Sequence, residues 1–176
     1  MAVNFWSTKK LIEICLPIMQ SDGRIVVLSS MISQKTLYNT KNQDLLEELS
    51  PNNIHLTLDR LEFLAKEFLE DFPKSGKGAI GWPKSSYGVS KQLLNCLVRI
   101  LSKDAKNLEK RLLINSCCPG FCSTDLSKGN PNAKKSPEDG AQNVVNLAIL
   151  PKGVKINGVF LCDAWISFYY SILILI

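Results

Sequence analysis

The sequence is poor in histidine and arginine, and both shortages exclude classes of function. His55 is the only histidine, and it lies in a polar, turn-rich stretch. A Ser/His/Asp hydrolase or an HExxH zinc site needs a histidine beside a nucleophile or a metal ion. Only four arginines are present, and no stretch interleaves them with aromatic residues as in proteins that bind nucleic acids. The sequence therefore predicts neither a metal ion nor a nucleic-acid partner.

Paired cysteine motifs and a long apolar run are also missing. The six cysteines form no CxxC pair, and the chain opens without the apolar core of a secretory signal. Reduced, mostly buried thiols in a cytoplasmic protein are therefore expected. The terminal segment 164–176 has 13 uncharged residues, fewer than the ~20 that cross a bilayer. It predicts an interfacial or aggregation-prone segment rather than a stable membrane span.

Length and charge are those of one compact globular domain. The chain has 176 residues, of which 45% are hydrophobic and 21% charged, with a formal net charge of +5. A basic surface suits an anionic ligand such as a dinucleotide phosphate, although lysines that are simply solvated give the same composition.

Hydrophobic periodicity predicts helices and strands in alternation. The segment 31–55 is polar and is expected to be irregular. The expected helices are 5–20, ending at the Ser21-Asp22-Gly23 turn, then Thr57–Phe72 before Pro73, Tyr87–Lys103, and a segment from the Ser136 cap to Leu150. The expected strands are 24–30, 112–118 and 158–162. This order predicts an α/β fold, with about three parallel strands and flanking helices in a doubly wound, Rossmann-like sheet.

One glycine pattern is misleading. Gly76, Gly78 and Gly81 spell GxGxxG, but a dinucleotide fingerprint must leave a strand and open a helix. Here the run follows a helix and meets Trp82-Pro83, so it predicts a loop.

The stretch GWPKSSYGVSK carries the clearest chemistry. Tyr87 and Lys91 lie four residues apart at the start of a helix, which places both side chains on one face. Reduction of a ketone needs a proton as hydride arrives, and a nearby ammonium favours the phenolate of a tyrosine whose ordinary pKa is ~10. A solvated i,i+4 pair has the same spacing, so the pattern needs support from elsewhere in the chain.

Two further stretches give that support. Ser29 and Ser30 end the first strand, where the carboxyl edge of a parallel sheet forms a ligand crevice. A serine there could orient a substrate carbonyl, or simply make a turn. The run CCPGFCSTD leaves the next strand through Pro119-Gly120 and offers donors at Ser123, Thr124 and Asp125. It could clasp a nicotinamide carboxamide, or be another turn.

The sequence resembles the short-chain dehydrogenase/reductase family, specifically its carbonyl reductases. The resemblance rests on three motifs in order: a strand ending in Ser-Ser, then YGVSK, then a strand ending in PGFCSTD. The resemblance implies that Ser30 orients the carbonyl, Tyr87 donates the proton, and Lys91 supports the tyrosine and binds ribose. It also implies that Tyr87 contacts the cofactor. Asn4 matches the asparagine that holds a proton-relay water. The implied nicotinamide contacts are Pro119, Gly120, Cys122, Ser123 and Thr124. The helix Thr57–Phe72 is similar to the segment that keeps carbonyl reductases monomeric.

The departures from the family concern its nucleotide-binding half. Nothing here matches the TGxxxGxG turn, whose helix N-terminus binds the pyrophosphate. We expect 1–162 to be the catalytic half of the family domain without its N-terminal half, and 163–176 to be a divergent hydrophobic tail. Ser123 stands where carbonyl reductases tend to carry arginine.

The resemblance implies an NADPH-dependent reductase of ketones, aldehydes or quinones, with a small-molecule carbonyl substrate. The alternative is a catalytically inactive truncated family member or an interaction module.

Overall fold

A computed structural model describes residues 1–74, 81–162, 165–168 and 171–174. It contains one five-stranded sheet in the order β1-β2-β3-β4-β5. β1 (Arg24–Leu28), β2 (Leu113–Cys118) and β3 (Phe160–Cys162) are parallel, which confirms the predicted parallel core of the fold. β1 is an edge strand of this described sheet.

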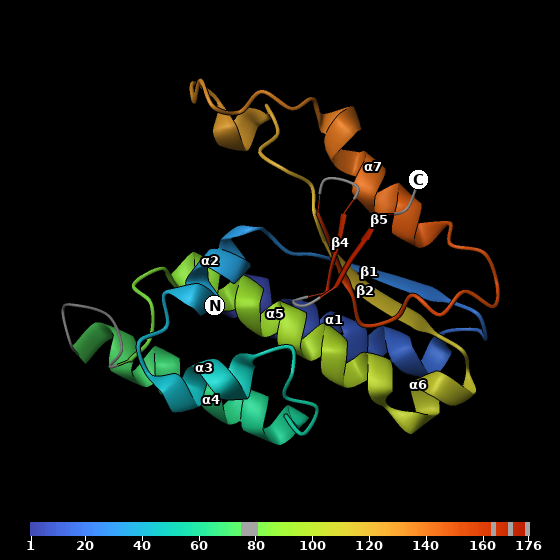
Figure 1. Cartoon of the computed structure of the whole chain (residues 1–176), viewed down its shortest axis with the longest axis horizontal. Helices are drawn as coiled ribbons and strands as arrows, with labels where there is room; N and C mark the ends of the chain where they lie inside the picture. Colours follow the sequence, from blue (N-terminus) through green and yellow to red (C-terminus); the bar gives the residue numbers. More distant parts are fainter. Residues whose placement is uncertain (75–80, 163–164, 169–170, 175–176) are drawn as a thin grey trace.

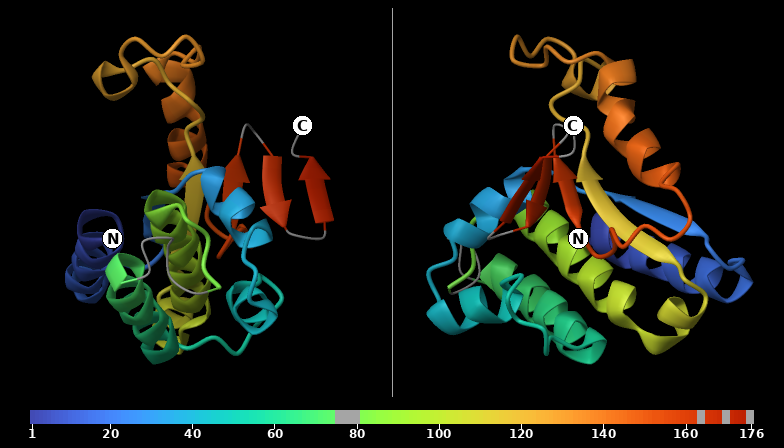
Figure 2. Two further views of the ribbon diagram at one scale, coloured as in Figure 1. Left: turned by 90° about the vertical axis from the view of Figure 1, so that its left-hand side faces the viewer. Right: turned by 45° about the vertical axis from the view of Figure 1, so that its right-hand side comes forward.

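The terminal segment adds two antiparallel strands to the parallel core. β4 (Trp165–Phe168) pairs with β3, and β5 (Ser171–Ile174) pairs with β4. Figure 2 shows this hairpin continuing the sheet on the side away from α1. The segment expected to be a divergent tail thus supplies backbone partners for β3.

Helices cover both faces of the sheet. On one face, α5 (Ser86–Lys103) packs on β2, and α4 (Leu58–Lys74) packs on α5 from outside. The N-terminal helix comprises a π-helical turn η1 (Ala2–Ser7), α1 (Thr8–Cys15) and a 3₁₀ turn η2 (Leu16–Ile18), and η1 contacts α5. α7 (Pro137–Ala148) covers β1 and β2 on the opposite face (Figure 1).

The helix boundaries follow the signals in the sequence. The Ser136 side chain accepts from Asp139 N at 3.0 Å, with Pro137 as the first helical residue, which confirms the predicted cap. Ser85 caps α5 in the same way by accepting from Gly88 N at 3.0 Å. α4 ends at Lys74, two residues beyond Phe72, where the sequence predicted its end.

The prediction for 31–55 was wrong, because the segment contains two short helices. α2 (Ile32–Tyr38) and α3 (Gln43–Leu49) have seven residues each, too few for a clear helical period. Asn42 caps α3 by accepting from Leu45 N at 3.2 Å. Leu37, Leu45 and Leu49 join the main core, so tertiary packing rather than local pattern stabilises both helices.

The core has two principal parts. The larger lies between the sheet and the helices of the first face and contains Phe5, Leu61, Leu93 and Ile114. A smaller cluster of Cys117, Leu147, Val159 and Leu161 lies under α7. All six residues of β2 are buried, as expected for a strand covered on both faces. The misleading glycine run falls largely outside the described residues, since these exclude Gly76 and Gly78.

The six cysteines, all of them among the described residues, form no disulfide bond. Within the ranges that the structure describes, no helix combines the length and hydropathy of a membrane span, and no group of acidic, cysteine or histidine side chains could hold a metal ion.

Candidate active site

Lys91 connects the first turns of α5 to the carboxyl end of β1. Its Nζ donates to the Leu28 carbonyl oxygen at 2.7 Å, and the Lys91 carbonyl oxygen accepts from Ser29 Oγ at 3.2 Å. Lys91 Nζ lies 5.8 Å from the centroid of the Tyr87 ring. The helical spacing of the two side chains therefore brings ammonium and phenol together beside the end of a strand.

Burial changes the ionisation of Lys91. Loss of solvent lowers the pKa of its ammonium below the ordinary 10.5, while a negative charge on Cys118 would act in the opposite direction. The hydrogen bond to the Leu28 carbonyl also favours the charged form. Burial raises the pKa of the Cys117 thiol, next to Cys118 in β2, to about 12, so the Cys117 thiol stays protonated at neutral pH.

We expect Lys91 to titrate below 10.5, the value of a solvated lysine. Because folding lowers the pKa of Lys91, the folded chain releases this proton at a lower pH than the unfolded chain does. Burying the charged ammonium lowers the free energy of unfolding, and this cost fades as the pH rises through the folded-state pKa. ¹³C NMR of the methylated lysines measures the titration, with Lys91→Arg identifying the resonance. Titration of that resonance at or above 10.5 would contradict the expectation.

Tyr87 lies at the surface, with 50% of the residue exposed. Three apolar residues at or after the ends of β1 and β2 are similarly accessible, with Leu28 50%, Met31 45% and Phe121 49% exposed. Because the carboxyl ends of β1 and β2 meet at one edge, a ligand there would meet apolar surface as well as Tyr87 and Lys91.

Ser30 lies in the connection from β1 to α2, directly after Ser29. Its Oγ accepts from the backbone N–H of Ile32 at 3.3 Å, and its carbonyl oxygen accepts from Ser33 Oγ at 2.6 Å. No hydrogen bond joins the Ser30 hydroxyl to the Tyr87 phenol among the described residues. The sequence left open whether Ser30 makes a turn or orients a carbonyl. The structure shows the turn contacts, and it places Ser30 at the sheet edge where a carbonyl-orienting serine was expected.

Asn4 lies in the π-helical turn η1, and its Nδ2 donates to Ser90 Oγ at 3.2 Å. η1 packs on α5, so Asn4 reaches the helix that carries Tyr87 and Lys91. The sequence motif contained Ser90, but nothing local indicated that Asn4 would bind it.

The loop after β2 is held by its own contacts and by α7. Gly120 has φ +83°, which favours glycine. The Ser123 N–H donates to the Lys135 carbonyl at 2.8 Å, and the Thr124 N–H donates to Ser127 Oγ at 2.9 Å. These two backbone donors are therefore used inside the loop, which leaves the exposed Ser123 hydroxyl at its surface.

α7 approaches this loop closely. Asn143 Nδ2 donates to the Cys118 carbonyl at 2.7 Å. A methyl group at Gly140 would lie 2.3 Å from Cys122 Sγ and 3.2 Å from the Pro119 carbonyl oxygen. A larger residue at this position would force Cys122 or the loop to shift. The sequence analysis missed this close approach because it joins distant segments.

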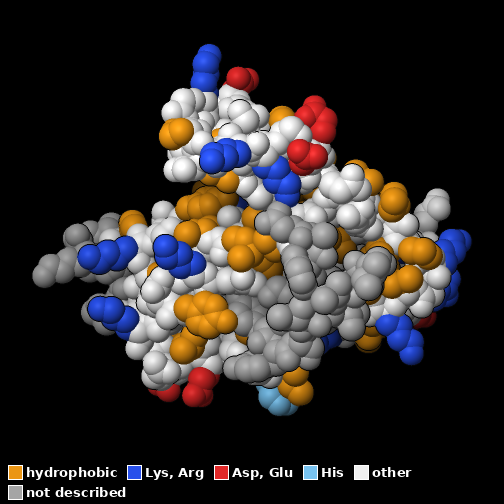
Figure 3. Space-filling model, turned by 45° about the horizontal axis from the view of Figure 1, so that its top comes forward, with side chains coloured by type: hydrophobic (Ala, Val, Ile, Leu, Met, Phe, Trp, Pro, Cys, Tyr) orange, Lys and Arg blue, Asp and Glu red, His pale blue; other side chains and the backbone are white. Residues whose placement is uncertain are grey.

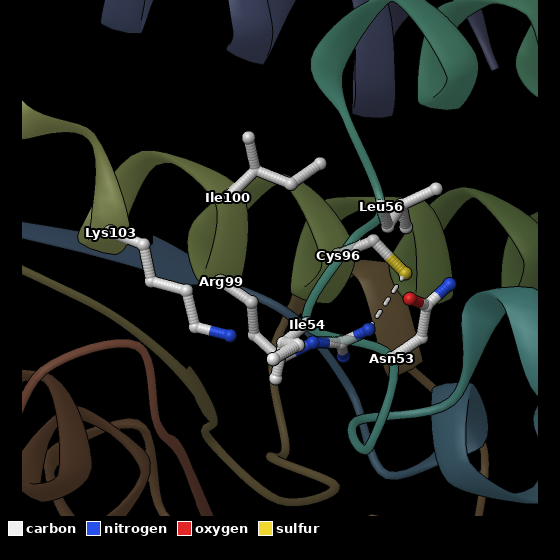
Figure 4. Close-up of a pocket in the computed structure, with 7 residues that line it drawn as sticks. All are labelled: Asn53, Ile54, Leu56, Cys96, Arg99, Ile100 and Lys103. Carbon is white, nitrogen blue, oxygen red and sulfur yellow. Dashed lines mark hydrogen bonds between the residues drawn. The ribbon is translucent and has the colours of Figure 1, made fainter.

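A separate small pocket lies further along α5 (Figure 4). Cys96, Arg99 and Lys103 line it with residues of the segment after α3, and Arg99 Nη2 donates to Cys96 Sγ at 3.3 Å. The same Nη2 donates to the Leu49 carbonyl at 3.0 Å, and burial raises the pKa of the Cys96 thiol. The contacts of Arg99 fix the end of α3. Burial outweighs the guanidinium, which by itself lowers the pKa of the Cys96 thiol, so the thiol stays protonated. Figure 3 shows basic side chains scattered over the visible face.

Comparison with known proteins decides the family. The chain is 37% identical over 153 residues to carbonyl reductase (NADPH) 1 of Mus musculus, covering 86% of this chain and 53% of that protein. It is 39% identical over 150 residues to carbonyl reductase (NADPH) 3 of the same species, covering 84% and 52%. The chain belongs to the short-chain dehydrogenase/reductase family. It spans about half the length of the curated relatives it matches.

Solved structures agree with this family. Salutaridine reductase from Papaver somniferum superimposes with a TM-score of 0.75 at 29% identity, covering 92% of this chain and 52% of that one. The carbonyl reductase Sniffer of D. melanogaster superimposes with a TM-score of 0.50 at 21% identity, covering 90% and 51%, and supports the fold alone. No family model matches the sequence.

Proposed function

We propose that this chain carries the proton-transfer half of an NADPH-dependent carbonyl reductase. The observation that supports this most directly is the ammonium of Lys91 beside the Tyr87 ring, anchored to the end of β1. The relatives named carbonyl reductase (NADPH) supply the reaction class. The substrates would be ketones, aldehydes or quinones, and the half-exposed apolar residues at the same edge suit compounds of this kind.

In this reduction the Tyr87 phenol gives its proton to the oxygen of the substrate carbonyl as the alkoxide develops. Lys91, held by the Leu28 carbonyl, stabilises the phenolate that remains, which lowers the barrier to proton transfer. Ser30 would hold the carbonyl oxygen near Tyr87, and Asn4 would hold the water through which the proton is replaced. Each of these steps uses a group at or beside the first turns of α5.

The described residues fit one end of the cofactor. Lys91 would bind the nicotinamide ribose, and the loop containing Pro119, Gly120, Cys122, Ser123 and Thr124 would border the nicotinamide, which supplies hydride when bound. The close packing of Gly140 and Asn143 against that loop gives it a fixed shape. The sequence contains no TGxxxGxG turn for the pyrophosphate, so these residues fit the nicotinamide end alone.

A catalytically inactive partial domain or interaction module is the second candidate. It is favoured by the edge position of β1 in the described sheet and by the lack of a TGxxxGxG turn in the sequence. Each charge-assisted hydrogen bond missing from the phosphate end would weaken cofactor binding by about 1.5–3 kcal/mol.

Titration of the folded chain with NADPH, followed by nicotinamide fluorescence, separates the two candidates. Saturable binding with oxidation of NADPH in the presence of a quinone is expected for the reductase. A native circular-dichroism spectrum without binding would reject the reductase for this chain and support the inactive alternative.

A further inference from the structure

A buried amide on α5 fastens the turn that follows β1. Asn95 is 4% exposed, and its Nδ2 donates to Ser33 Oγ at 2.9 Å. Ser33 is 0% exposed, and its Oγ donates to the Ser30 carbonyl oxygen at 2.6 Å. Two consecutive hydrogen bonds therefore lead from α5 to the backbone of Ser30, the residue expected to orient the substrate carbonyl.

The direction of these bonds follows from the protons available. A serine hydroxyl has one proton, and that of Ser33 goes to the Ser30 carbonyl oxygen. Ser33 Oγ can then only accept from Asn95, which turns the NH₂ group of the amide toward the turn. Ser30 Oγ accepts from the Ile32 N–H at 3.3 Å, and no hydrogen bond among the described residues uses its own proton. The Ser30 hydroxyl thus keeps a proton that it can donate to a ligand.

Asn95 belongs to the face of α5 that carries the candidate site. Tyr87, Lys91 and Asn95 follow one another at intervals of four residues, so they are neighbours along the helix surface. Lys91 holds the end of β1, and Asn95 holds Ser33 in α2, which packs on α5 (Figure 1). Ser30 lies between these two anchors in the chain. The helix that carries Tyr87 therefore fixes Ser30 from both sides.

Stability alone does not explain an asparagine at this position. Asn95 Oδ1 is buried, and no described residue donates to it. A buried acceptor without a donor weakens the folded state, so an apolar residue would avoid this cost. Gln92, on the same helix, also has an unpartnered Oε1, but its Nε2 donates to the Leu49 carbonyl oxygen at 3.2 Å. The two amides thus differ in the segment that each of them holds.

We propose that Asn95 is a positioning residue that, through Ser33, holds the turn of Ser30 so that the Ser30 hydroxyl donates to the substrate carbonyl. The inference rests on the proposed function, because it gives Asn95 a place in that reaction. Without the Asn95 amide, Ser33 loses its bond to α5, and the turn is free to shift relative to Tyr87. Reduction then slows, while Lys91 still binds the cofactor.

Amide hydrogen exchange tests the anchor without any need for turnover. The Ile32 N–H reports on the turn, because Ser30 Oγ accepts from it. Asn95→Ala and Ser33→Ala should each speed exchange of this N–H by ~3–10-fold, the effect of one hydrogen bond. Ser30→Ala, which removes the acceptor, is the positive control, and Gln92→Ala, an equally buried amide on α5, is the negative control. An Ile32 N–H that keeps its original exchange rate in Asn95→Ala would overturn the inference.

Kinetics tests the consequence for reduction. Asn95→Ala should lower kcat by ~3–10-fold, while the KM for NADPH stays within about twofold because Lys91 is unchanged. Gln92→Ala should leave both constants unchanged. In a Ser30→Ala background, Asn95→Ala should lower kcat no further, since Asn95 acts through Ser30.

Two kinetic results would refute the positioning role. One is a loss of kcat in Ser30→Ala/Asn95→Ala that equals the combined losses of the single variants, and the other is a normal kcat in Asn95→Ala. A rise in the KM for NADPH as large as the fall in kcat would also count against it, because it indicates general damage to α5. If the unsubstituted chain oxidises no NADPH, the proposed function fails, and the Ile32 exchange rate still decides whether Asn95 holds the turn.

Discussion

Replacing Tyr87 by phenylalanine is expected to lower kcat/KM for NADPH-dependent carbonyl reduction by ~10²–10⁴-fold, the usual contribution of one general acid. The substitution removes the only phenol beside Lys91 among the described residues and keeps the ring. Because Tyr87 is half exposed and its hydroxyl has no structural bond in the described part of the chain, folding should be unaffected. Steady-state kinetics with circular dichroism measures both quantities.

Tyr38→Phe is the matched control for this variant. Tyr38 lies at the end of α2 and is 74% exposed, so loss of its hydroxyl should leave reduction unchanged. NADPH binding should also persist in Tyr87→Phe, since Lys91 and the loop after β2 remain. A Tyr87→Phe protein with undiminished kcat/KM would remove Tyr87 from the mechanism.

Gly88→Ala is expected to destabilise the fold by about 1–3 kcal/mol, the cost of overpacking a tight core. Gly88 lies in the first turns of α5, next to Tyr87, where α2 packs. An added Cβ would lie 2.0 Å from Thr36 Oγ1 and 3.1 Å from Ser85 Oγ. Helix propensity alone favours alanine over glycine by ~1 kcal/mol. A fall in the free energy of unfolding would therefore show that the packing clash outweighs helix propensity. Urea unfolding measures it.

The double variant Gly88→Ala/Thr36→Ala separates overpacking from other causes. Thr36 is 4% exposed, and its Oγ1 is the nearest atom to the added methyl group. Removing that oxygen should recover much of the lost stability, so the two substitutions should be strongly non-additive. A Gly88→Ala chain of unchanged or higher stability, or a double variant that only adds the two losses, would disprove this account of α2 packing.

The elements predicted best are those with long, regular patterns. α4, α5 and α7 present apolar residues at helical spacing, and α7 also has a serine cap followed by proline. Such signals come from neighbours within a few residues, so they are readable without tertiary context. The parallel core follows from the alternation of strands and helices, since a parallel pair requires a crossover.

The segment 31–55 shows where local reading fails. α2 buries Ser33 and Thr36 along with Leu37, so its buried face is largely polar and gives no apolar stripe. Asn95 Nδ2 donates to Ser33 Oγ at 2.9 Å, a contact between residues 62 positions apart. Polar residues that are buried because a distant partner satisfies them look solvent-exposed in a one-dimensional pattern.

The sequence by itself determined the family motifs, the main helices and the pairing of Tyr87 with Lys91, because an i,i+4 spacing fixes a common face through local geometry. Only the tertiary structure decided what these side chains meet. Lys91 reaches Leu28 across 63 residues, Asn4 reaches Ser90 across 86, and α7 holds the loop after β2 through Asn143 and Gly140. Such contacts depend on how helices pack on the sheet, and no segment alone contains that information.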